Sequence, residues 1–530
     1  MVLDYDVIFL GTGHNALVAQ AYLARSGLRT LCLERAENPG GGLATIKNPR
    51  LPGFVHNPHS FFHRGINIMP WYRDLELKRQ GLKYIEPELN VALYGQNGHR
   101  LEWWTELNRT IDSFATFSKK DATTLRRWVE EFEPIVKNIL TPEAQSPPLP
   151  NKRRIKLLKR TAIGRRLLEV SALSPLEFIA REFENDTIRA GLLFFNGLRE
   201  IDLRQPGFGH AIPALLASPA RAQMCEGGSV NLARALINDI KEHSGEIRCC
   251  TEIKQIRTKN NAVNGIELSN GEYLKTSTIV SGLNPQQTFI DLLPSDVLPV
   301  EIRKRVEQFQ YNLIAPLFGL HLALNSPATL PGENQPLMYV LGLDRFNQFK
   351  EIVRAHELGE IPAPVTWGAC PTIHDPSQAP AGKHTAFLWE KLPYALHGNS
   401  KNWESEKDQH GQHLLKFWSE HSRDLTGNVL DQFTLSPADT EATLPNMVAG
   451  DLLVGSFANG QVGENRPFPG AGKYRTPVKG LYLCGGSTHP GGNITGLCGY
   501  NAARVLIADA GVRQWWKSPD IESHLADLKD

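Results

Sequence analysis

The chain has 530 residues, and its 57 Lys and Arg against 56 Asp and Glu give a formal net charge of +1 at pH 7. This balance does not indicate a nucleic acid or a strongly acidic partner. Seven cysteines without a CxxC or CxxxxC pair predict reduced, mostly buried thiols and exclude a redox dithiol motif. Strand-like sequence begins almost at Met1 and no run of 18 uncharged apolar residues follows. We therefore expect a cytoplasmic protein, with any membrane contact at its surface.

The first 45 residues have the pattern of a dinucleotide-binding βαβ unit. The apolar run 6–10 predicts a strand, Gly11 and Gly13 a tight turn, 16–26 a helix, and 29–33 a second strand that ends at Glu34. Gly13 lets the backbone approach a pyrophosphate, and Ala16 lets the helix pack closely on the strand. The free N–H groups of the helix N-terminus suit phosphate oxygens. Glu34 would bind a ribose diol, which favours FAD or NAD over NADP.

The segment after Glu34 separates FAD from NAD. It runs through Gly40, Gly41 and Gly42 to Thr45 and resembles the extension of glutathione-reductase-type flavoproteins, in which a second glycine turn lies under the flavin. That resemblance implies FAD.

Residues 51–70 are rich in aromatic and histidine side chains, and we expect them near the isoalloxazine ring. The alternative, which we favour for any single one of His56, His59 and His63, is that the aromatic residues lie in the core and the histidines at the surface. The spacing of these histidines could suit a metal ion, but no further metal-binding residues accompany them in the sequence, so no metal site is predicted.

The sequence from 71 to 223 changes to long, charged helical patterns, which predicts the start of an inserted substrate or cap domain. Residues 151–168 hold eight Lys and Arg and no acid, with apolar residues near one helical face. Such a basic amphipathic helix suits an anionic membrane surface or a partner helix, and a solvated surface helix has the same composition. Trp515 and Trp516, between Arg513 and Lys517, are also consistent with contact at a membrane surface. Alternatively, both tryptophans belong to the core.

The chain returns to the cofactor domain near Cys225. A helix over 230–243 and strands over 247–256, 262–268 and 273–280 are predicted, with Asn270-Gly271 as a hairpin turn. Ile253 is a candidate for adenine contact, and Gly282 begins another turn against the cofactor. The Cys249-Cys250 pair is interpreted as strand packing. The loop containing Asp375 and Pro376 is explained by turn geometry, with no catalytic role needed.

The C-terminal pattern is a strand over 480–484, a turn of small residues and a helix over 498–510. This predicts a second anion site for the pyrophosphate and ribityl chain of the same FAD. Two other glycine pairs, 207/209 and 470/472, lie in loops without a βαβ frame, so a second nucleotide unit is not predicted. The predicted cofactor-binding residues are Gly11, Gly13, His14, Asn15, Ala16, Glu34, Arg35, Gly41, Gly42, Ala44, Thr45, Ile253, Gly282, Gly485, Gly486, Gly492, Asn493 and Ile494.

These motifs together resemble the phytoene desaturase superfamily, including the desaturase-like β-carotene ketolases. The resemblance rests on Gly11-x-Gly13-His14-Asn15, on Glu34 followed by Pro39-Gly40-Gly41, on the loop from Asp375 to His384, and on the segment from Pro477 to Gly496. It implies non-covalent FAD, an α/β fold and oxidation of long apolar, carotenoid-like molecules. Thr12 and Ala16 depart from the family's usual Ala and Gly but are small enough for the turn.

We therefore expect a glutathione-reductase-type FAD Rossmann domain formed by residues 1–70, 224–290 and 460–512. A substrate or cap domain of antiparallel sheet plus helices (71–223 and 291–459) is interleaved with it, and 513–530 form a tail. The expected partner is a hydrophobic small molecule, without nucleic acid.

The expected activity is hydride removal from a hydrophobic, isoprenoid-like or aromatic substrate to flavin N5, with reoxidation by oxygen or quinone. The alternatives are a flavin amine or alcohol oxidase acting on a small molecule, and a non-catalytic flavin-binding assembly protein. His489, His59 and His63 are the candidate catalytic bases.

Overall fold

A computed structural model describes residues 3–95, 98–196 and 201–529, without the side chains of 195 and 196. The first of its two large sheets is five-stranded and entirely parallel, in the order β10-β2-β1-β14-β20. Its three central strands, β2, β1 and β14, are fully buried and rich in β-branched and leucine residues, as expected for a sheet covered on both faces, whereas the edge strand β10 is partly exposed. They are β1 (Val7–Leu10), β2 (Thr30–Leu33), β10 (Glu246–Arg248), β14 (Ile279–Ser281) and β20 (Leu481–Leu483).

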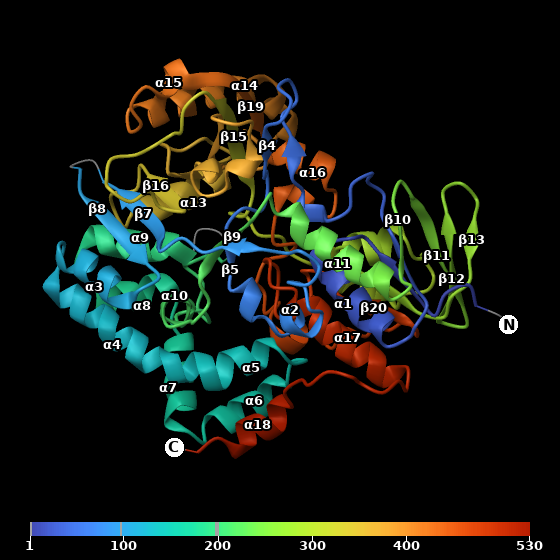
Figure 1. The fold of residues 1–530 in the computed structure, drawn as a ribbon. Helices are drawn as coiled ribbons and strands as arrows, with labels where there is room; N and C mark the ends of the chain where they lie inside the picture. The colour runs from blue at the N-terminus through green and yellow to red at the C-terminus, as the bar shows by residue number, and fades with distance from the viewer. Residues whose placement is uncertain (1–2, 96–97, 197–200, 530) are drawn as a thin grey trace.

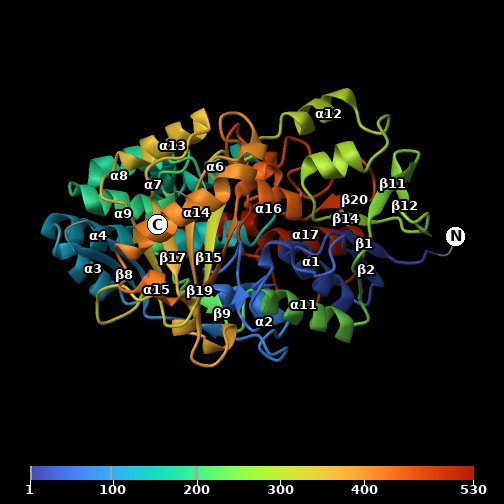
Figure 2. The ribbon, with the colours of Figure 1, turned by 90° about the horizontal axis from the view of Figure 1, so that it is seen from above.

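Three helices pack beside this sheet, and α1 contacts both others (Figures 1 and 2). They are α1 (His14–Arg25), α11 (Val230–Glu242) and α17 (Leu497–Asp509). The α1 and α17 helices approach so closely that a Cβ on Gly499 would lie 1.8 Å from the Asn15 carbonyl oxygen. The predicted strand–turn–helix patterns at both ends of the chain are confirmed, and they meet in this layer. A separate small antiparallel sheet is formed by β11 (Ile253–Lys259), β12 (Ala262–Leu268) and β13 (Tyr273–Leu274).

The second large sheet has seven strands in the order β19-β15-β18-β17-β16-β7-β8 and is antiparallel except between β16 and β7. The strands are β7 (Leu89–Tyr94), β8 (Arg100–Trp104), β15 (Leu317–Leu324), β16 (Met338–Leu341), β17 (Thr366–Ala369), β18 (His384–Lys391) and β19 (Val429–Leu435). Short pairs elsewhere are β3 (Ile46–Lys47) with β4 (Val55–His56), and β9 (Ala222–Cys225) with β5 (His63–Arg64) and β6 (Tyr84–Ile85).

Most of the remaining helices belong to two groups. The first follows β8 in the chain and extends in Figure 1 from beside β8 down to α18: α3 (Leu107–Ala115), α4 (Lys119–Ile135), α5 (Thr141–Ala144), α6 (Asn151–Leu158), α7 (Ala162–Ser171), α8 (Pro175–Glu182), α9 (Asp186–Asn196) and α10 (Ala211–Leu216). The second lies among or after the later strands: α12 (Val300–Glu307), α13 (Gln348–Leu358), α14 (Trp403–Ser419), α15 (Leu425–Asn428) and α16 (Pro437–Thr443). The α2 helix (Pro70–Asp74) packs near α1, and α18 (Ile521–Asp527) contacts α6.

Two local expectations from the sequence are corrected. The basic stretch 151–168 is two helices, α6 and α7, because Thr161 caps α7 by accepting the Gly164 N–H at 3.2 Å and interrupts the first helix. The Cys249-Cys250 pair lies between β10 and β11 and not within a strand. Cys250 is exposed with φ of +51°, so it turns the chain instead of packing in a sheet.

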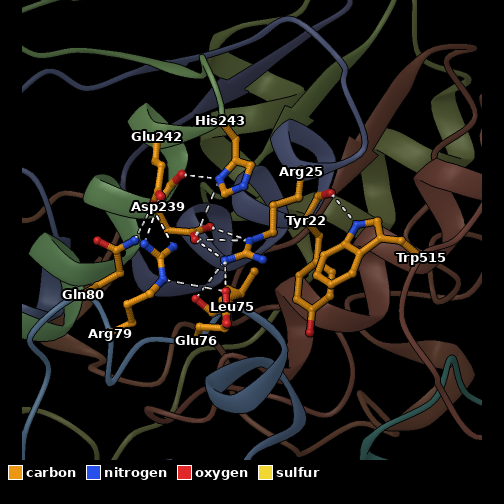
Figure 3. Close-up of polar contacts among 10 residues, drawn as sticks. All are labelled: Tyr22, Arg25, Leu75, Glu76, Arg79, Gln80, Asp239, Glu242, His243 and Trp515. Carbon is orange, nitrogen blue, oxygen red and sulfur yellow. Dashed lines mark hydrogen bonds and ion pairs between the residues drawn. The ribbon is translucent and has the colours of Figure 1, made fainter.

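Of the two tail tryptophans, only Trp516 is a core residue, and Trp515 remains 38% exposed. Trp516 is buried and Trp515 stacks on Tyr22 of α1 with ring centroids 5.2 Å apart (Figure 3). None of the helices among the described residues has the length and apolarity needed to cross a bilayer.

Candidate active site

A cavity of about 690 Å³ lies where four parallel strands end. The residues that follow β1, β2, β14 and β20 all line it, beginning with Gly11, Glu34, Gly282 and Gly485. The β1 strand is flanked by β2 on one side and β14 on the other, so connections leave it in opposite directions. This topological switch point, at the carboxyl ends of the strands, is where open α/β sheets bind ligands.

The turn after β1 fits a dinucleotide pyrophosphate. Gly11 has φ of +80° and its N–H donates to the Leu33 carbonyl at 2.8 Å, which fixes the turn against β2. Gly13 is the N-cap of α1 and no side chain caps this helix, so its first N–H groups are free for a ligand. A Cβ on Gly13 would meet no protein atom within 4 Å, although Gly13 lines the cavity. The open space and the uncapped helix end therefore fit the phosphates of FAD.

Glu34 is held in place by Thr12, a residue whose role was not predicted from the sequence. The Thr12 N–H and hydroxyl donate to Glu34 Oε2 at 2.9 and 2.6 Å, and the Ala36 N–H donates to Oε1 at 2.9 Å. The buried Thr12 hydroxyl also accepts the Gly40 N–H at 3.1 Å. A carboxylate has about four acceptor positions, so capacity remains for a ribose hydroxyl. Thr12 thus joins the two glycine turns and orients the acid.

Replacing Thr12 by valine should weaken FAD binding, because Glu34 loses a hydrogen bond and the Gly40 N–H loses its buried acceptor. We expect the dissociation constant to rise about tenfold or more, because an unsatisfied buried polar group costs about 1–3 kcal/mol. Fluorescence titration of apoprotein with FAD measures this. Thr12→Ser, which keeps the hydroxyl, is the matched control, and equal affinity of the valine variant and the wild type would contradict the role of Thr12.

All predicted cofactor-binding residues except Thr45 line this one cavity. Thr45 lies behind its wall, where the hydroxyl donates to Asn57 at 2.9 Å and accepts the Val230 N–H at 3.0 Å. It therefore supports the wall instead of facing a ligand. Ile253, which begins β11, lines the cavity together with Thr251 and Glu252.

Of the three candidate bases, only His59 lines the cavity. His63 is buried, with its ring nitrogens 2.7 Å from Ser60 Oγ and 2.9 Å from the Tyr84 hydroxyl. His489 Nε2 lies 3.0 Å from the Glu143 carbonyl oxygen. Burial lowers the pKa of His59 to about 4 and that of His63 to about 3, so both are neutral at pH 7. A neutral His59 can accept a proton from a molecule in the cavity.

Buried histidines should make the protein sensitive to acid. Burial lowers the folded-state pKa below the ordinary value near 6.5, so the unfolded chain binds protons first as the pH falls. Their stabilising effect is complete above pH 6.5 and is lost as the pH falls through about 4. We expect the urea midpoint of unfolding to fall steeply between pH 6.5 and 4. Equal midpoints at pH 7 and 4.5 would contradict this. The pKa is lowered to about 4 for His14, His56, His59, His210, His356 and His489.

The rest of the cavity is lined mainly by apolar and aromatic side chains from the second sheet and its loops. Trp367 and Trp389 come from neighbouring strands β17 and β18, with ring centroids 6.2 Å apart. The other apolar side chains that line it include Phe61, Phe62, Leu317, Leu444, Met447, Leu452, Leu453 and Val454. This composition is typical of a site for an apolar ligand.

Lys391 is a second residue whose place in the site was not predicted from the sequence. It is nearly fully buried, lines the cavity, donates from Nζ to the Ala315 carbonyl at 2.8 Å and lies 5.8 Å from the Trp367 ring centroid. Lys391 is the last residue of β18 and lies two residues after Trp389, so both side chains are on the same face of the strand. Glu390 between them points to the other face, where it pairs with His410 at 2.8 Å. The alternation of side chains along a strand could have predicted that Trp389 and Lys391 share one face of β18, but not that this face lines the cavity.

Asp239, Glu242 and His243 form a cluster at the end of α11, outside the cavity, whose ligand atoms lie within 4.8 Å of one another (Figure 3). Asp239 is bound by the Arg25 guanidinium at 2.6 Å, and Glu242 by both Arg79 nitrogens at 2.9 and 2.8 Å. Because cations already neutralise these carboxylates, the cluster is explained as ion pairing that joins α11 to α1 and to the segment after α2.

Comparisons with known proteins agree with this architecture. Residues 10–75 match a family model described as an NAD(P)-binding Rossmann-like domain. The chain is 28% identical to one of the chains of limonene dehydrogenase from Castellaniella defragrans, over 98% of this chain and 97% of that protein. It is 26% identical to pyridine nucleotide-disulfide oxidoreductase domain-containing protein 2 of Rattus norvegicus, over 96% and 94%.

More distant matches include a carotenoid enzyme and a solved amine oxidase. A phytoene desaturase of Rhodobacter capsulatus is 23% identical over 52% of this chain and 51% of its own length. Cyclohexylamine oxidase from Brevibacterium oxydans superimposes with a TM-score of 0.60 at 14% identity, covering 96% of this chain and all of that structure. At this identity the superposition shows a shared fold.

Proposed function

We propose a specific activity for this chain, which belongs to the phytoene desaturase-like superfamily of FAD-dependent oxidoreductases. It removes a hydride from a hydrophobic, isoprenoid-like or aromatic substrate, and the acceptor is a non-covalently bound FAD that oxygen or a quinone reoxidises. A relative named limonene dehydrogenase covers almost the whole chain, which supports a terpene-like substrate.

The observation that carries the proposal is the continuity of one cavity. The same space is lined at one part by the glycine turns and Glu34, and at another by Phe61, Trp367 and Trp389. A dinucleotide held by the turns and an apolar molecule held by the aromatic rings would therefore share one enclosed volume. This arrangement favours catalysis over a flavin sealed away from any substrate.

Bound FAD supplies the hydride acceptor, and the protein supplies binding, orientation and a dry environment. Glu34 would hold the ribose, and the N-terminus of α1 would hold the pyrophosphate. Trp367, Trp389 and Phe61 would orient an apolar substrate and exclude water from it. Of the three candidate bases, His59 is the one that lines the cavity, and it would accept a proton at Nδ1 or Nε2 as the substrate becomes unsaturated.

An amine oxidase activity receives less support from the same geometry. Amine substrates carry a positive charge at neutral pH, and the side-chain ammonium of Lys391 lies in the aromatic part of the cavity. In a low-dielectric site two like charges repel strongly. An uncharged hydrocarbon or alcohol has no such penalty.

Anaerobic flavin reduction tests the proposal. Purified protein with FAD is mixed without oxygen with monocyclic terpenes, carotenoids, aromatic alcohols or primary amines, while the flavin absorbance near about 450 nm is recorded. Bleaching by a terpene, a carotenoid or an aromatic alcohol is expected. Bleaching by amines alone would favour the oxidase alternative. A loss of absorbance with NADPH alone would contradict the expected absence of a nicotinamide site.

We also propose peripheral contact with an anionic membrane through α6. Lys152, Lys156 and Lys159 with the exposed Ile155 follow i, i+3, i+4, i+7 spacing on one exposed face, and Arg160 follows. In the described residues these four cations have no carboxylate within ion-pair distance, whereas Arg153 and Arg154 pair with Glu522 and Glu143.

Neutralising this face should release the protein from vesicles. Each Lys or Arg near an anionic surface contributes about 1 kcal/mol, so glutamine at 152, 156, 159 and 160 should lower partitioning by at least about a hundredfold. Co-sedimentation with phosphatidylserine-containing vesicles measures it. Glutamine at the exposed lysines 119, 350, 401 and 416 is the control of equal charge. Equal sedimentation of the two variants would refute the α6 contact.

A further inference from the structure

Two buried charged residues bracket a chain segment that forms one wall of the cavity. Asp451 and Arg466 are each 0% exposed, and Leu452, Leu453 and Val454 between them line the cavity. Among the described residues neither charge has an oppositely charged side chain within ion-pair distance. Each is bound to backbone groups instead, so their role differs from that of the surface ion pairs elsewhere in the fold. We call residues 451–466 the wall segment.

Asp451 holds the beginning of the wall segment. Its Oδ2 accepts the N–H groups of Asn312 at 2.9 Å and Gly455 at 2.8 Å, and its Oδ1 accepts the N–H of Leu453 at 2.9 Å. Three such bonds offset the cost of burying a carboxylate. They bend residues 451–455 around one side chain and attach that bend to Asn312, which precedes β15.

Arg466 holds the other end and extends to the cofactor turn. One terminal nitrogen donates to the carbonyls of Ser456 at 2.8 Å and Gln461 at 3.1 Å. The other donates to Gly455 and to Gly486, both at 3.0 Å. Gly455 is therefore bound through its N–H by Asp451 and through its carbonyl by Arg466. Gly486 belongs to the turn after β20 that lines the cavity.

The wall segment lies directly on this turn, without space for side chains between them. A Cβ on Gly492 would lie 2.1 Å from the Leu453 carbonyl oxygen, and one on Gly491 would lie 2.5 Å from the Phe457 ring. The Phe457 ring in turn covers the Arg466 guanidinium, whose carbon lies 4.4 Å from the ring centroid. Any shift of Arg466 would therefore move the turn at 485–492 and the cavity wall together.

We propose that Asp451 and Arg466 are positioning residues of the flavin site, and that the buried positive charge of Arg466 makes the bound flavin easier to reduce. This inference depends on the FAD binding in the proposed function. Burial lowers the pKa of Arg466 to about 10, which leaves it charged at neutral pH. Hydride transfer adds negative charge to the flavin, and a fixed cation behind Gly486 stabilises that charge in a low-dielectric surrounding. The carboxylate of Asp451 acts in the opposite direction.

The test measures the flavin midpoint potential and the FAD dissociation constant, and neither needs a substrate. Arg466→Met should shift the reduction equilibrium at least about tenfold toward oxidised flavin, which is about 30 mV for two electrons, and should weaken FAD binding. Asp451→Asn should shift the equilibrium the other way. Arg466→Lys keeps the charge but cannot reach four carbonyls, so it should retain the potential and lose affinity. Arg25→Met is the control, because it removes a partly buried arginine that pairs with Asp239 (Figure 3) and does not line the cavity.

Wild-type potentials in both Arg466→Met and Asp451→Asn would overturn the electrostatic role. Wild-type FAD affinity in Arg466→Lys would overturn the positioning role, and this variant decides that question even where the methionine variant does not fold. A shift in Arg25→Met as large as that in Arg466→Met would also contradict the inference, since it would arise from general destabilisation. A wild-type protein that binds no FAD would instead refute the proposed function.

Discussion

Gly13→Val is expected to abolish FAD binding while the protein stays folded. The new side chain would meet no protein atom within 4 Å at its Cβ, and the φ and ψ of Gly13, −58° and 151°, suit a valine. The valine methyls would occupy the space that a pyrophosphate needs beside the α1 N-terminus. We expect the FAD dissociation constant to rise at least about a hundredfold, equal to about 2.7 kcal/mol.

The measurement is a pair of experiments on the same sample: FAD titration for affinity and thermal unfolding of the apoprotein for stability. Gly427→Ala serves as the control, because its Cβ would also meet no atom within 4 Å but Gly427 lies in α15, outside the cavity lining. An unfolded Gly13→Val apoprotein, or one that binds FAD like the wild type, would contradict the account of this turn.

Gly499→Ala is expected to cause a large loss of stability. Its Cβ would lie 1.8 Å from the Asn15 carbonyl oxygen and 2.7 Å from the carbonyl carbon, so α1 and α17 would have to separate. Backbone atoms cannot rotate away as a side chain can, and we expect a loss of about 3 kcal/mol or more. FAD binding should weaken as well, because the α1 N-terminus moves.

Urea unfolding measured by circular dichroism tests this prediction. Gly427→Ala is again the matched substitution, and it should change the free energy of unfolding by less than about 1 kcal/mol. A Gly499→Ala protein with the wild-type urea midpoint would show that the two helices do not pack as closely as described.

Local patterns were sufficient to predict which residues line the glycine-turn half of the cavity. A glycine turn between a strand and a helix has few alternative folds, so Gly11, Gly13 and Glu34 could be placed from spacing alone. The C-terminal glycines were recognised by the same pattern. The structure brings these segments together because β1 and β20 are parallel strands of one sheet and end at the same edge.

The remaining features depend on contacts between distant parts of the chain, which no local pattern encodes. The bond from Arg466 to Gly486 joins two loops that are 20 residues apart, and Lys391 comes to lie beside Trp367 because β18 pairs with β17. His489 and His63 have histidine chemistry suited to a base, but neither lines the cavity: His489 Nε2 lies beside the Glu143 carbonyl, and both ring nitrogens of His63 are taken up by Ser60 and Tyr84. Residue type indicated possible chemistry, and only tertiary packing could distinguish His59 from the other two.

The most direct test of the central claim is the flavin content of the purified protein. The protein is saturated with FAD, freed of excess cofactor and precipitated with acid, and the flavin in the supernatant and in the pellet is quantified. The account predicts one FAD per chain, released entirely into the supernatant. Flavin that remains with the pellet would contradict non-covalent binding. A protein that retains no flavin would contradict the proposal that the cavity lined by Glu34 and Gly492 binds FAD.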